Sequence, residues 1–373
     1  MRIVQLANLY SPVSGGLRTA VDALGRGYLA AGHDRVLVVP GRSYTRRQTE
    51  AGPVVTVPGP SIAPGYRFVL DPRPVLRVLD RLGPDVVEVS DKATLAVAAR
   101  WARRRGVRSV LFSHERLDAI LAPRLPRLPE RLPVERALQQ ATDCWNRRLA
   151  SAFDAIVVTS AFAAAEFVRV GAPALHRVPL GVDLGTFRPP PRAASGRVAG
   201  EVRLINLGRL SAEKRPELAL EAAIELRRRG MDVKLDMVGE GPLGPALRRA
   251  AGREGLRAEF HGHVRSRADV ARLLGRADVA LATCPVESFG LAVLEALACG
   301  TPVVAADRGA AGELLVRGAG VAAPATGTGF ADGVAEVLGW PEGWRRAGAR
   351  CRAELYPWSA TVAGMLRVHT GGD

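Results

Sequence analysis

Short apolar runs of about four to six residues alternate along the chain with longer stretches whose apolar positions recur at helical spacing. Such runs predict buried strands, and the stretches between them predict helices that cover parallel sheets. The predicted strands form a first series, Arg2–Ala7, Arg35–Val39, Val54–Val57, Val86–Val89, Ser109–Ser113 and Ala155–Thr159. A second series follows, Val202–Leu207, Lys234–Val238, Ala258–His261, Val279–Ala282 and Pro302–Ala305. The predicted helices include Leu17–Ala31, Glu217–Arg229 and Pro245–Gly252. The predicted fold class is α/β, with two Rossmann-like, doubly wound domains.

The break between the two series lies at Arg188–Gly200, which has the proline, glycine and small residues of a linker. We therefore expect an N-terminal domain over residues 1–187, a linker over 188–200 and a C-terminal domain over 201–355. A last helical segment is expected over 356–373, with Pro357 near its start, where a helix tolerates proline. Ligands of open α/β sheets bind at the carboxyl ends of the strands, so we expect the site in the cleft between the two sheets.

The composition, 47% apolar and 24% charged over 373 residues, gives each predicted domain enough apolar surface for its own core. The cysteines show no metal-ligand spacing and are typical of reduced thiols, which indicates a cytoplasmic protein; they are Cys144, Cys284, Cys299 and Cys351. The opening residues MRIVQLANLY predict a strand rather than a signal peptide. No apolar run of about 18 residues predicts a membrane span.

The formal net charge of +15 comes almost entirely from arginine. Three interpretations compete: a nucleic-acid partner, an anionic membrane surface or acidic substrate, and a compositional bias that leaves a solvated basic surface. The charge is uneven, because residues 100–150 hold 12 Arg against 5 Asp or Glu. This unevenness favours a surface in the first half that meets anionic lipid, peripherally on the inner face of the plasma membrane.

Two predicted strand–helix junctions have the residues of a phosphate-binding loop. In Ser14-Gly15-Gly16, paired glycines let backbone N–H groups approach a phosphate at a helix N-terminus; an ordinary tight turn is the alternative. In the segment GRLSAEK, Arg209 and Lys214 are five residues apart and are able to reach one diphosphate, where charge builds as it leaves. Cations at a helix start oppose the helix dipole, so their presence favours an anionic ligand over a bare surface.

A pair of carboxylates marks the segment ESFGLAVLEALACGTPVV. Glu287 lies in the loop after a predicted strand, and Glu295 lies within the helix that Ser288-Phe289-Gly290 opens. Such a pair is able to span a ligand, with one carboxylate at a sugar and the other at ribose hydroxyls, while backbone N–H groups at Phe289–Leu291 face phosphates. The alternative is a capped helix with one surface glutamate. The apolar residues around Glu295 predict a buried carboxylate, which needs a partner.

Three further features are ambiguous. Gly239–Gly244 matches the glycine spacing of a dinucleotide fingerprint, but Pro242 removes an N–H that a pyrophosphate would use. His261 and His263 resemble a zinc pair without an apparent third ligand, so we interpret that segment as a loop. His114 follows a predicted strand end, where it is either a structural residue or part of the site. No Asp-x-Asp occurs in the chain, which argues against a divalent metal that holds a diphosphate.

The motifs GRLSAEK, VGEGP, HGHV and ESFGLAVLEALACGTPVV, in this order, resemble the second domain of the GT-B retaining glycosyltransferases of family 4. The SGG near the N-terminus, PLGVD at 179–183 and the final WSATV fit the same family. Four segments of the first half, LANLYSPVSGGLRTAVDALG, EVSDKATL, SHERLDAIL and VPLGVDLGTF, resemble the actinobacterial GDP-mannose-dependent α-mannosyltransferases within it. Those enzymes act on phosphatidylinositol mannosides or glucuronosyl diacylglycerol.

The resemblance implies two Rossmann-like domains, a donor bound mainly by the second, and a C-terminal helix that crosses back to the first. It implies that Arg209 and Lys214 bind the diphosphate, and that Glu287 holds the sugar and Glu295 the ribose. Gly16 would meet the β-phosphate and His114 the sugar or acceptor side. The residues expected at the donor are Gly15, Gly16, Arg209, Lys214, Val264, Glu287, Phe289, Gly290, Leu291 and Glu295. The residues expected in catalysis are His114, Arg209, Lys214 and Glu287.

The expected function is therefore retaining, metal-independent transfer of a hexose, mannose from GDP-mannose, to a membrane lipid or glycolipid, with no cofactor and no nucleic acid. A front-face path is expected, because no carboxylate is placed as a covalent nucleophile. The alternatives are a UDP-sugar donor with another acceptor, and an epimerase, a phosphorylase or a non-catalytic binding protein. One stretch, Ala122–Arg136, matches no family motif; its leucines and arginines suggest a membrane-facing element, but its prolines argue against a regular amphipathic helix.

Overall fold

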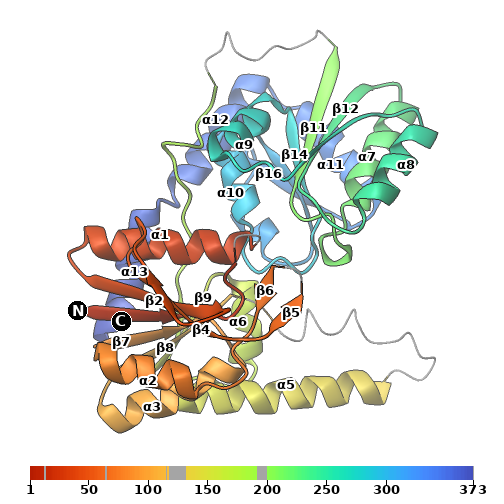
Figure 1. Cartoon of the computed structure of the whole chain (residues 1–373). Coiled ribbons are helices and arrows are strands. Elements are labelled where there is room, and N and C mark those ends of the chain that lie inside the picture. Colours follow the sequence, from red (N-terminus) through yellow and green to blue (C-terminus); the bar gives the residue numbers. More distant parts are fainter. Residues whose placement is uncertain (12–13, 64, 115, 117–131, 191–199, 373) are drawn as a thin grey trace. The chain divides into compact units, whose positions relative to one another are not determined.

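The chain divides into two compact units, one formed by Met1–Leu180 with Trp358–Asp373 and the other by Gly181–Pro357. The computed structural model describes residues 1–11, 14–63, 65–114, 116, 132–190 and 200–372, without the side chains of 132–135 (Figure 1). Most of the linker expected over 188–200 lies outside the described residues. The α/β fold class with two parallel sheets, predicted from the alternation of apolar runs and helical stretches, is confirmed.

The first unit is built on a sheet with the strand order β10-β9-β8-β7-β1-β2-β4-β3. Its strands pair in parallel except for the edge strand β3, which runs antiparallel to β4. The strands are β1 (Arg2–Leu6), β2 (Asp34–Gly41), β3 (Thr45–Arg47), β4 (Val54–Pro58), β7 (Val86–Val89), β8 (Arg108–Ser113), β9 (Ala155–Val158) and β10 (Leu175–Arg177), beside a small ribbon of β5 (Ser61–Ala63) and β6 (Tyr66–Arg67).

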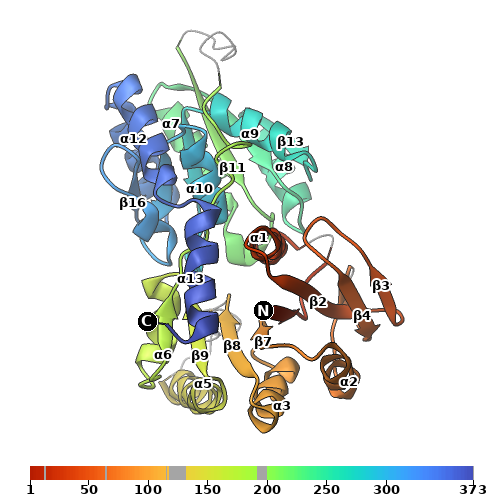
Figure 2. The same cartoon turned by 90° about the vertical axis from the view of Figure 1, so that its left-hand side faces the viewer.

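Helices cover both faces of this sheet, as continuous runs of Val, Ile and Leu in the strands require. Figure 2 shows α1 and α13 on one side and α2, α3 and α5 on the other, and the second group builds the larger core with α6. The helices are α1 (Gly16–Ala30), α2 (Arg73–Leu82), α3 (Val97–Arg105), α5 (Leu132–Ala152), α6 (Ala161–Val168) and α13 (Trp358–Thr370), with a 3₁₀ turn η1 (Thr94–Ala96).

The second unit is built on an all-parallel sheet with the strand order β13-β12-β11-β14-β15-β16. The order reverses beside β11, so the loops that follow β11 and β14 leave the sheet side by side, which is where open α/β sheets bind ligands. The strands are β11 (Glu201–Leu207), β12 (Asp232–Val238), β13 (Arg257–Gly262), β14 (Val279–Ala282), β15 (Val303–Ala306) and β16 (Gly320–Ala323).

In this unit α7, α8 and α11 lie on one face of the sheet and α9, α10 and α12 on the other (Figure 1). The first group fills the core with leucine, valine and alanine side chains of the strands. The helices are α7 (Glu217–Arg228), α8 (Gly244–Arg253), α9 (Arg267–Arg276), α10 (Leu291–Ala298), α11 (Gly327–Leu338) and α12 (Glu342–Glu354), with 3₁₀ turns η4 (Ala212–Lys214) and η5 (Ala311–Leu314).

Residues 181–187, which the sequence placed in the first domain, belong to the second unit. Val182 forms a bridge with Pro357, and the ring of Phe187 is fully buried. The guanidinium of Arg350 also donates to the carbonyl oxygen of Phe187 at 2.9 Å. This segment therefore packs by backbone pairing and burial that composition does not reveal.

Among the strands of the described chain, the sequence missed the short β3, β5, β6, β10 and β16, because runs of two to four residues carry little periodicity. It also gave no bounds for the longer helices α5, α11 and α12. It began the last strand of the second series one residue early, since β15 begins at Val303. Within the described residues, no helix combines the length and the apolar character that a bilayer crossing needs. Most of the Ala122–Arg136 stretch lies outside the described residues, and α5 begins at Leu132.

Candidate functional site

The second unit brings together Lys214 and Glu287, which are far apart in the sequence. The ammonium of Lys214, at the end of η4, donates to Oε2 of Glu287 at 2.7 Å. η4 follows β11, and Glu287 lies in the loop between β14 and α10, so both groups stand at carboxyl ends of adjacent strands. Both side chains keep about a quarter of their surface exposed, 30% and 26%. The pair is thus accessible to a ligand.

Buried polar contacts attach the η4 loop to the end of β14. Oγ1 of Thr283 donates to the carbonyl oxygen of Lys214 at 2.8 Å, and Sγ of Cys284 donates to that of Glu213 at 3.3 Å. Asn206, at the end of β11, donates to the carbonyl oxygen of Leu281 at 2.8 Å. The sequence analysis gave these residues no role in the site; the signal was their polar character at the end of β11 and directly after β14.

The charges of this pair stabilise each other. Burial works to raise the pKa of the Glu287 carboxyl, but the ammonium of Lys214 and the N–H groups of Phe289 and Ser288 outweigh burial and hold that pKa below its usual range. Burial likewise works to lower the pKa of Lys214, and the charge of Glu287 reverses this and raises it. An ionised, oriented carboxylate therefore faces an ammonium that stays charged.

Arg209 is the more exposed cation of the same loop, with 59% of its side chain accessible. Its guanidinium lies 3.6 Å from Oε1 of Glu213, a separation that leaves donors available for a ligand. The backbone after it is unusual, because Arg215 has φ 49°, a left-handed conformation rare outside glycine. Strained backbone of this kind clusters at functional sites.

The helix α10 begins directly after Gly290, in the segment between the two carboxylates. Gly290 precedes the helix with φ 105°, a conformation that favours glycine, and no side-chain oxygen of a described residue caps the helix. Phe289 is buried and Leu291 is half-buried, so the backbone here is fixed while the first N–H groups of α10 lack an intrahelical partner. Such a helix start suits an anionic ligand.

The buried carboxylate of Glu295 has the partner that its burial required. Nη2 of Arg267, the first residue of α9, donates to Oε1 of Glu295 at 2.9 Å. Arg267 follows the loop between β13 and α9, in which Val264 is half-buried. The structure thus places Val264 and Glu295 on neighbouring elements, and it adds Arg267, which the sequence analysis did not consider.

The first unit holds the other predicted site residues. Gly15 precedes α1 and Gly16 is its first residue; both are exposed, and an added Cβ at Gly15 would meet nothing within 4 Å. No side chain among the described residues caps α1, and no acidic residue lies in its first turn. The N–H groups at the start of α1 are therefore accessible to an anion. Packing against neighbouring residues does not require a glycine at position 15.

His114 follows β8 and stands beside Ser90, with Nε2 of the ring 3.1 Å from the serine Oγ. Burial lowers the pKa of His114 to about 4; the charge of Glu88 opposes this and that of Lys92 adds to it. Phe112 packs its ring 4.1 Å from the imidazole centroid. The ring is consequently neutral at physiological pH, and it offers one donor and one acceptor.

The glycine-spaced segment Gly239–Gly244 has a packing explanation. An added Cβ at Gly239 would lie 1.9 Å from the carbonyl oxygen of Gly208, and one at Gly241 would lie 2.3 Å from that of Leu210. N–H of Leu210 donates to the carbonyl oxygen of Glu240 at 3.0 Å. These glycines let the loop after β12 lie against the loop that positions Arg209. The glycine spacing is therefore explained by packing, and a dinucleotide-binding fingerprint is not needed to account for it.

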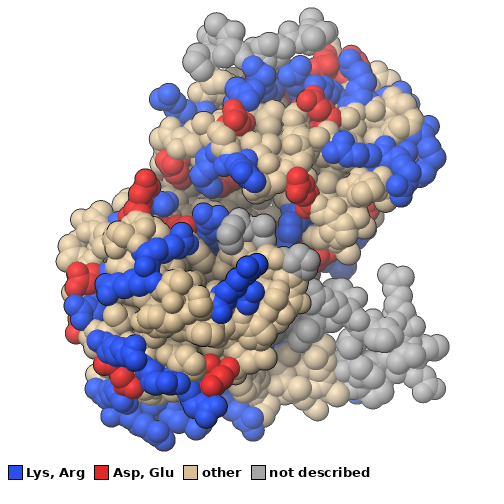
Figure 3. All heavy atoms as spheres, viewed as in Figure 1, with Lys and Arg blue, Asp and Glu red and all other residues tan. Residues whose placement is uncertain are grey.

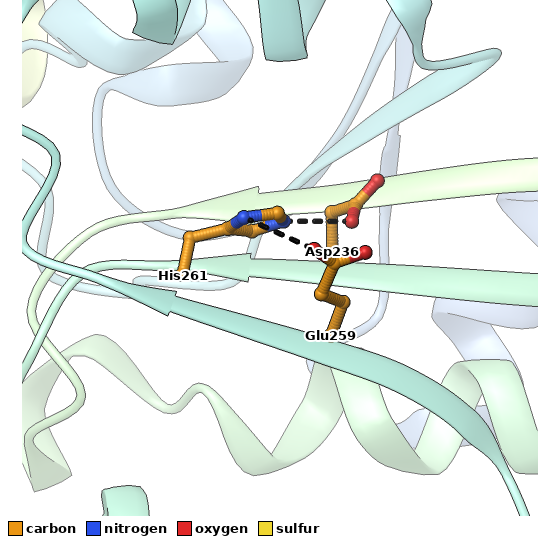
Figure 4. Close-up of side chains that lie close together, drawn as sticks. All are labelled: Asp236, Glu259 and His261. Atoms are coloured by element: carbon orange, nitrogen blue, oxygen red, sulfur yellow. Dashed lines mark hydrogen bonds and ion pairs between the residues drawn. The ribbon is translucent and has the colours of Figure 1, made fainter.

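His261 lies within β13, in agreement with the predicted strand Ala258–His261, but the interpretation that it has no further ligand group is wrong, because two carboxylates lie beside it (Figure 4). Nε2 of His261 is 2.8 Å from Oδ1 of Asp236, and Nδ1 is 3.6 Å from Oε1 of Glu259. One ligand atom from each residue lies within 4.8 Å of the others. Lys234, however, already donates to Glu259 at 2.7 Å, so the cluster is an ion-pair network on the outer strands, whose charges also discourage edge pairing.

Comparison with known families identifies both units. A family model described as "Glycosyl transferases group 1" matches residues 201–339, and one described as "Glycosyltransferase Family 4" matches residues 14–186. The chain is 44% identical to a GDP-mannose-dependent alpha-(1-6)-phosphatidylinositol dimannoside mannosyltransferase of Mycobacterium tuberculosis, over 98% of this chain and 95% of that protein. It is 27% identical to the corresponding monomannoside mannosyltransferase of Mycolicibacterium smegmatis, over 84% and 82% of the two chains.

Solved structures share the fold at low identity. HepE of Anabaena in complex with UDP superposes with a TM-score of 0.78 at 18% identity, and all of both chains is covered. A sucrose-phosphate synthase of Thermosynechococcus elongatus gives a TM-score of 0.78 at 18% identity and covers 99% of this chain and 98% of that one. These likenesses establish the two-domain architecture independently of the sequence motifs.

Proposed function

Since the chain belongs to the family 4, group 1 glycosyltransferases, we propose that it transfers mannose from GDP-mannose to a phosphatidylinositol-based glycolipid and retains the anomeric configuration. The observation that carries the reaction class is the contact of Lys214 with Glu287 at the switch point of the second sheet. The 44% identity to the dimannoside mannosyltransferase supports the donor and the acceptor class.

In this proposal the donor diphosphate lies against Arg209, Lys214 and the first N–H groups of α10. Two fixed cations and a helix N-terminus stabilise the negative charge that builds on the departing nucleoside diphosphate. The ammonium of Lys214 is held in place by Glu287, so it needs no reorganisation as that charge develops. These groups perform the task that a divalent ion has in other transferases, and we propose a metal-independent reaction.

The two carboxylates take the hydroxyl groups of the donor. Glu287 accepts hydrogen bonds from the sugar with the oxygen that Lys214 leaves available, and Glu295 accepts them from the ribose. Val264 and Phe289 form the wall of the proposed nucleotide site, and the backbone N–H groups of Gly290 and Leu291 are its donors, because the N–H of Phe289 already contacts Glu287. In the first unit, the backbone N–H groups at Gly15 and Gly16 are available to a phosphate group, which is the role that we propose for them.

We propose a front-face displacement for the chemical step. The bond from the anomeric carbon to the phosphate oxygen breaks, and a bond from the acceptor oxygen to that carbon forms on the same face. The acceptor proton passes to the departing phosphate oxygen, which becomes a stronger base as it leaves. His114, neutral because burial lowers its pKa to about 4, orients the sugar or acceptor hydroxyl rather than acting as a charged acid.

A thermal-shift panel with GDP, UDP and ADP tests the donor. A ligand that binds only the folded state at 100 times its dissociation constant stabilises by about 2.7 kcal/mol, which is several degrees in Tm. We expect GDP alone to raise Tm substantially, and the same shift with EDTA present. Stabilisation by UDP alone would favour the UDP-sugar alternative and contradict the mannosyl proposal.

We further propose that the basic surface over α2 and α3 meets an anionic bilayer. Figure 3 shows Lys and Arg side chains gathered over this side of the first unit. The exposed arginines of the two helices are Arg73, Arg77, Arg81, Arg100, Arg103, Arg104 and Arg105. A cluster of this size near a lipid surface contributes about 1 kcal/mol of attraction per cation, which brings the enzyme to a lipid acceptor.

Vesicle flotation tests this surface with two matched double variants. Arg100→Gln with Arg104→Gln removes two exposed cations of α3, and Arg249→Gln with Arg253→Gln removes two exposed cations of α8. Only the first variant should weaken binding to phosphatidylinositol vesicles, by about tenfold or more, and phosphatidylcholine vesicles should bind neither. Equal effects of the two variants would contradict the proposed surface.

A further inference from the structure

Arg267 occupies a position that a helix disfavours for a cation. It is the first residue of α9, where the helix dipole repels positive charge, while the preceding Ser266 accepts a hydrogen bond from the N–H of Asp269. Its side chain keeps 44% of its surface exposed. Contacts with groups outside α9 must therefore offset the unfavourable position of this cation.

Two contacts fix the guanidinium of Arg267. Nη2 donates to Oε1 of Glu295 at 2.9 Å, and the guanidinium carbon lies 4.8 Å from the ring centroid of Phe187. Phe187 is fully buried, so the aromatic face is a rigid support for the cation. Arg267 is thus held between an immobile ring and a carboxylate.

Glu295 depends on this contact. Its side chain is only 12% exposed, and within the described parts of the chain Arg267 is the side chain that hydrogen-bonds it. Burial raises the pKa of Glu295, and the charge and hydrogen bond of Arg267 work in the opposite direction. Without Arg267 an ionised carboxylate at this position would have no compensating partner, and the protonated form would be favoured.

We propose that Arg267 is a positioning residue that keeps the Glu295 carboxylate oriented and ionised, so that it accepts hydrogen bonds from the ribose hydroxyls of the donor nucleotide. This inference rests on the proposed function, because it assumes a nucleoside diphosphate in the second unit. Arg267 occupies one lone pair of Oε1, so the remaining acceptor sites of the carboxylate are available to the ribose.

The other titratable neighbours of Glu295 do not change state near neutral pH. Cys299 follows α10, and burial together with the charge of Glu295 raises its pKa to about 12. Arg350, on α12, opposes that rise. Burial works to raise the pKa of Asp183, and Arg267 lowers it, but the hydrogen bonds of Thr186 and Gly185 lower it more. A pH dependence of nucleotide affinity near neutral pH that appears only when Arg267 is changed therefore reports on Glu295.

Calorimetric titration of GDP at pH 6, 7 and 8 tests the proposal with Arg267→Gln. Each Kd is divided by the wild-type Kd at the same pH, which removes the titration of the nucleotide phosphates. We expect GDP binding to weaken about tenfold at pH 6 and less at pH 8, because loss of Arg267 raises the pKa of Glu295. Arg267→Lys should restore part of the affinity, since it returns a charge.

Arg272→Gln is the matched control, because Arg272 is an equally exposed arginine of α9 that pairs with Asp269 of its own helix. It should leave the Kd for GDP unchanged at every pH. Wild type should also prefer GDP over 2′-deoxy-GDP, and Arg267→Gln should bind the two alike. The positioning role is wrong if the ratio of the Arg267→Gln Kd to the wild-type Kd is the same at every pH. It is also wrong if Arg267→Gln prefers GDP over 2′-deoxy-GDP as strongly as wild type does.

The experiment distinguishes a failure of the proposed function from a failure of the positioning role of Arg267. If wild type binds no nucleoside diphosphate, the proposed function fails and the positioning role fails with it. If wild type binds GDP but Arg267→Gln binds it equally well, the positioning role alone is wrong. A variant that loses GDP affinity equally at all pH values would assign Arg267 a direct contact with the nucleotide and reject its action through Glu295.

Discussion

The contact of Lys214 with Glu287 joins two segments that the sequence marked separately, one by its cations and one by its carboxylates. Neither residue is unusual alone. Their pairing at 2.7 Å gives an ammonium with a fixed position and a carboxylate that stays ionised. At the scale of single residues, the proposed site therefore rests on this pair, with Arg209 beside it in sequence.

Glu287→Gln should lower the rate of mannosyl transfer at least about 100-fold, because the amide cannot hold the charge of Lys214 or accept as many hydrogen bonds from the sugar. The fold should persist, since both side chains are partly exposed and the amide keeps an acceptor. Release of GDP from GDP-mannose with a phosphatidylinositol mannoside acceptor measures the rate. Glu336→Gln, an exposed residue of α11, is the control and should be fully active; wild-type rates in Glu287→Gln would contradict the assignment.

His114 should not titrate between pH 5.5 and 8, because its pKa is lowered to about 4. The unfolded chain gains a proton on this residue near pH 6.5 while the folded chain does not. Its neutral form thus contributes stability above pH 6.5, and this contribution declines as the pH falls from 6.5 toward 4. NMR of the imidazole resonances, assigned with His114→Gln, measures the pKa directly, and a midpoint near 6.5 would contradict the buried, neutral ring.

At the scale of elements, glycines decide where loops are able to meet. Gly239 ends β12 with φ 133°, and its missing side chain leaves room for the carbonyl oxygen of Gly208. In the sequence, this glycine is the first of a segment whose glycine spacing resembles a dinucleotide-binding fingerprint. Its role is instead to pack the loop after β12 against the loop that positions Arg209 and Lys214.

Gly239→Ala and Gly255→Ala compare two glycines of positive φ, of which only one has a crowded Cβ position. At Gly255, φ is 60° and alanine adds strain of about 1 kcal/mol, whereas at Gly239, φ is 133° and the backbone strain is larger. Only at position 239 does the added Cβ also meet a backbone oxygen, at 1.9 Å. Chemical denaturation should show at least about 2 kcal/mol more destabilisation for Gly239→Ala, together with weaker GDP binding. Equal losses in the two variants would refute the packing role.

At the scale of the whole molecule, a buried polar network attaches the last helix to the first unit. Glu88 of β7 is fully buried; it accepts from Tyr28 at 2.8 Å and Gln5 at 2.8 Å, and lies 3.3 Å from Nε2 of His369 on α13. Burial works to raise the pKa of Glu88, and these partners outweigh it and hold that pKa below its usual value. Gln5 and His369, which lie near opposite ends of the sequence, thus belong to one cluster.

Glu88→Gln should lower stability by about 2 kcal/mol at pH 7, because it leaves His369 without its anionic partner. The ionised carboxylate stabilises the folded state above its unfolded pKa, and this contribution is lost as the pH falls below about 4.5. The difference in calorimetric Tm between variant and wild type should therefore shrink from pH 7 to pH 4. Glu50→Gln, exposed in the same unit, should change Tm at neither pH; a difference for Glu88→Gln that is constant with pH would show that its charge is not responsible.

The sequence by itself determined the α/β class, most strands, the carboxylate pair at Glu287 and Glu295 and the cations at Arg209 and Lys214, because apolar periodicity and motif spacing are local properties of the chain. Only the tertiary structure decided which of these groups touch. It paired Lys214 with Glu287 and Glu295 with Arg267, and it brought His261 beside Asp236. It also joined residues 181–187 to the second unit. Those contacts depend on the order of the strands in each sheet and on the room that glycines leave for neighbouring backbone. Neither property can be predicted from a single segment of the sequence.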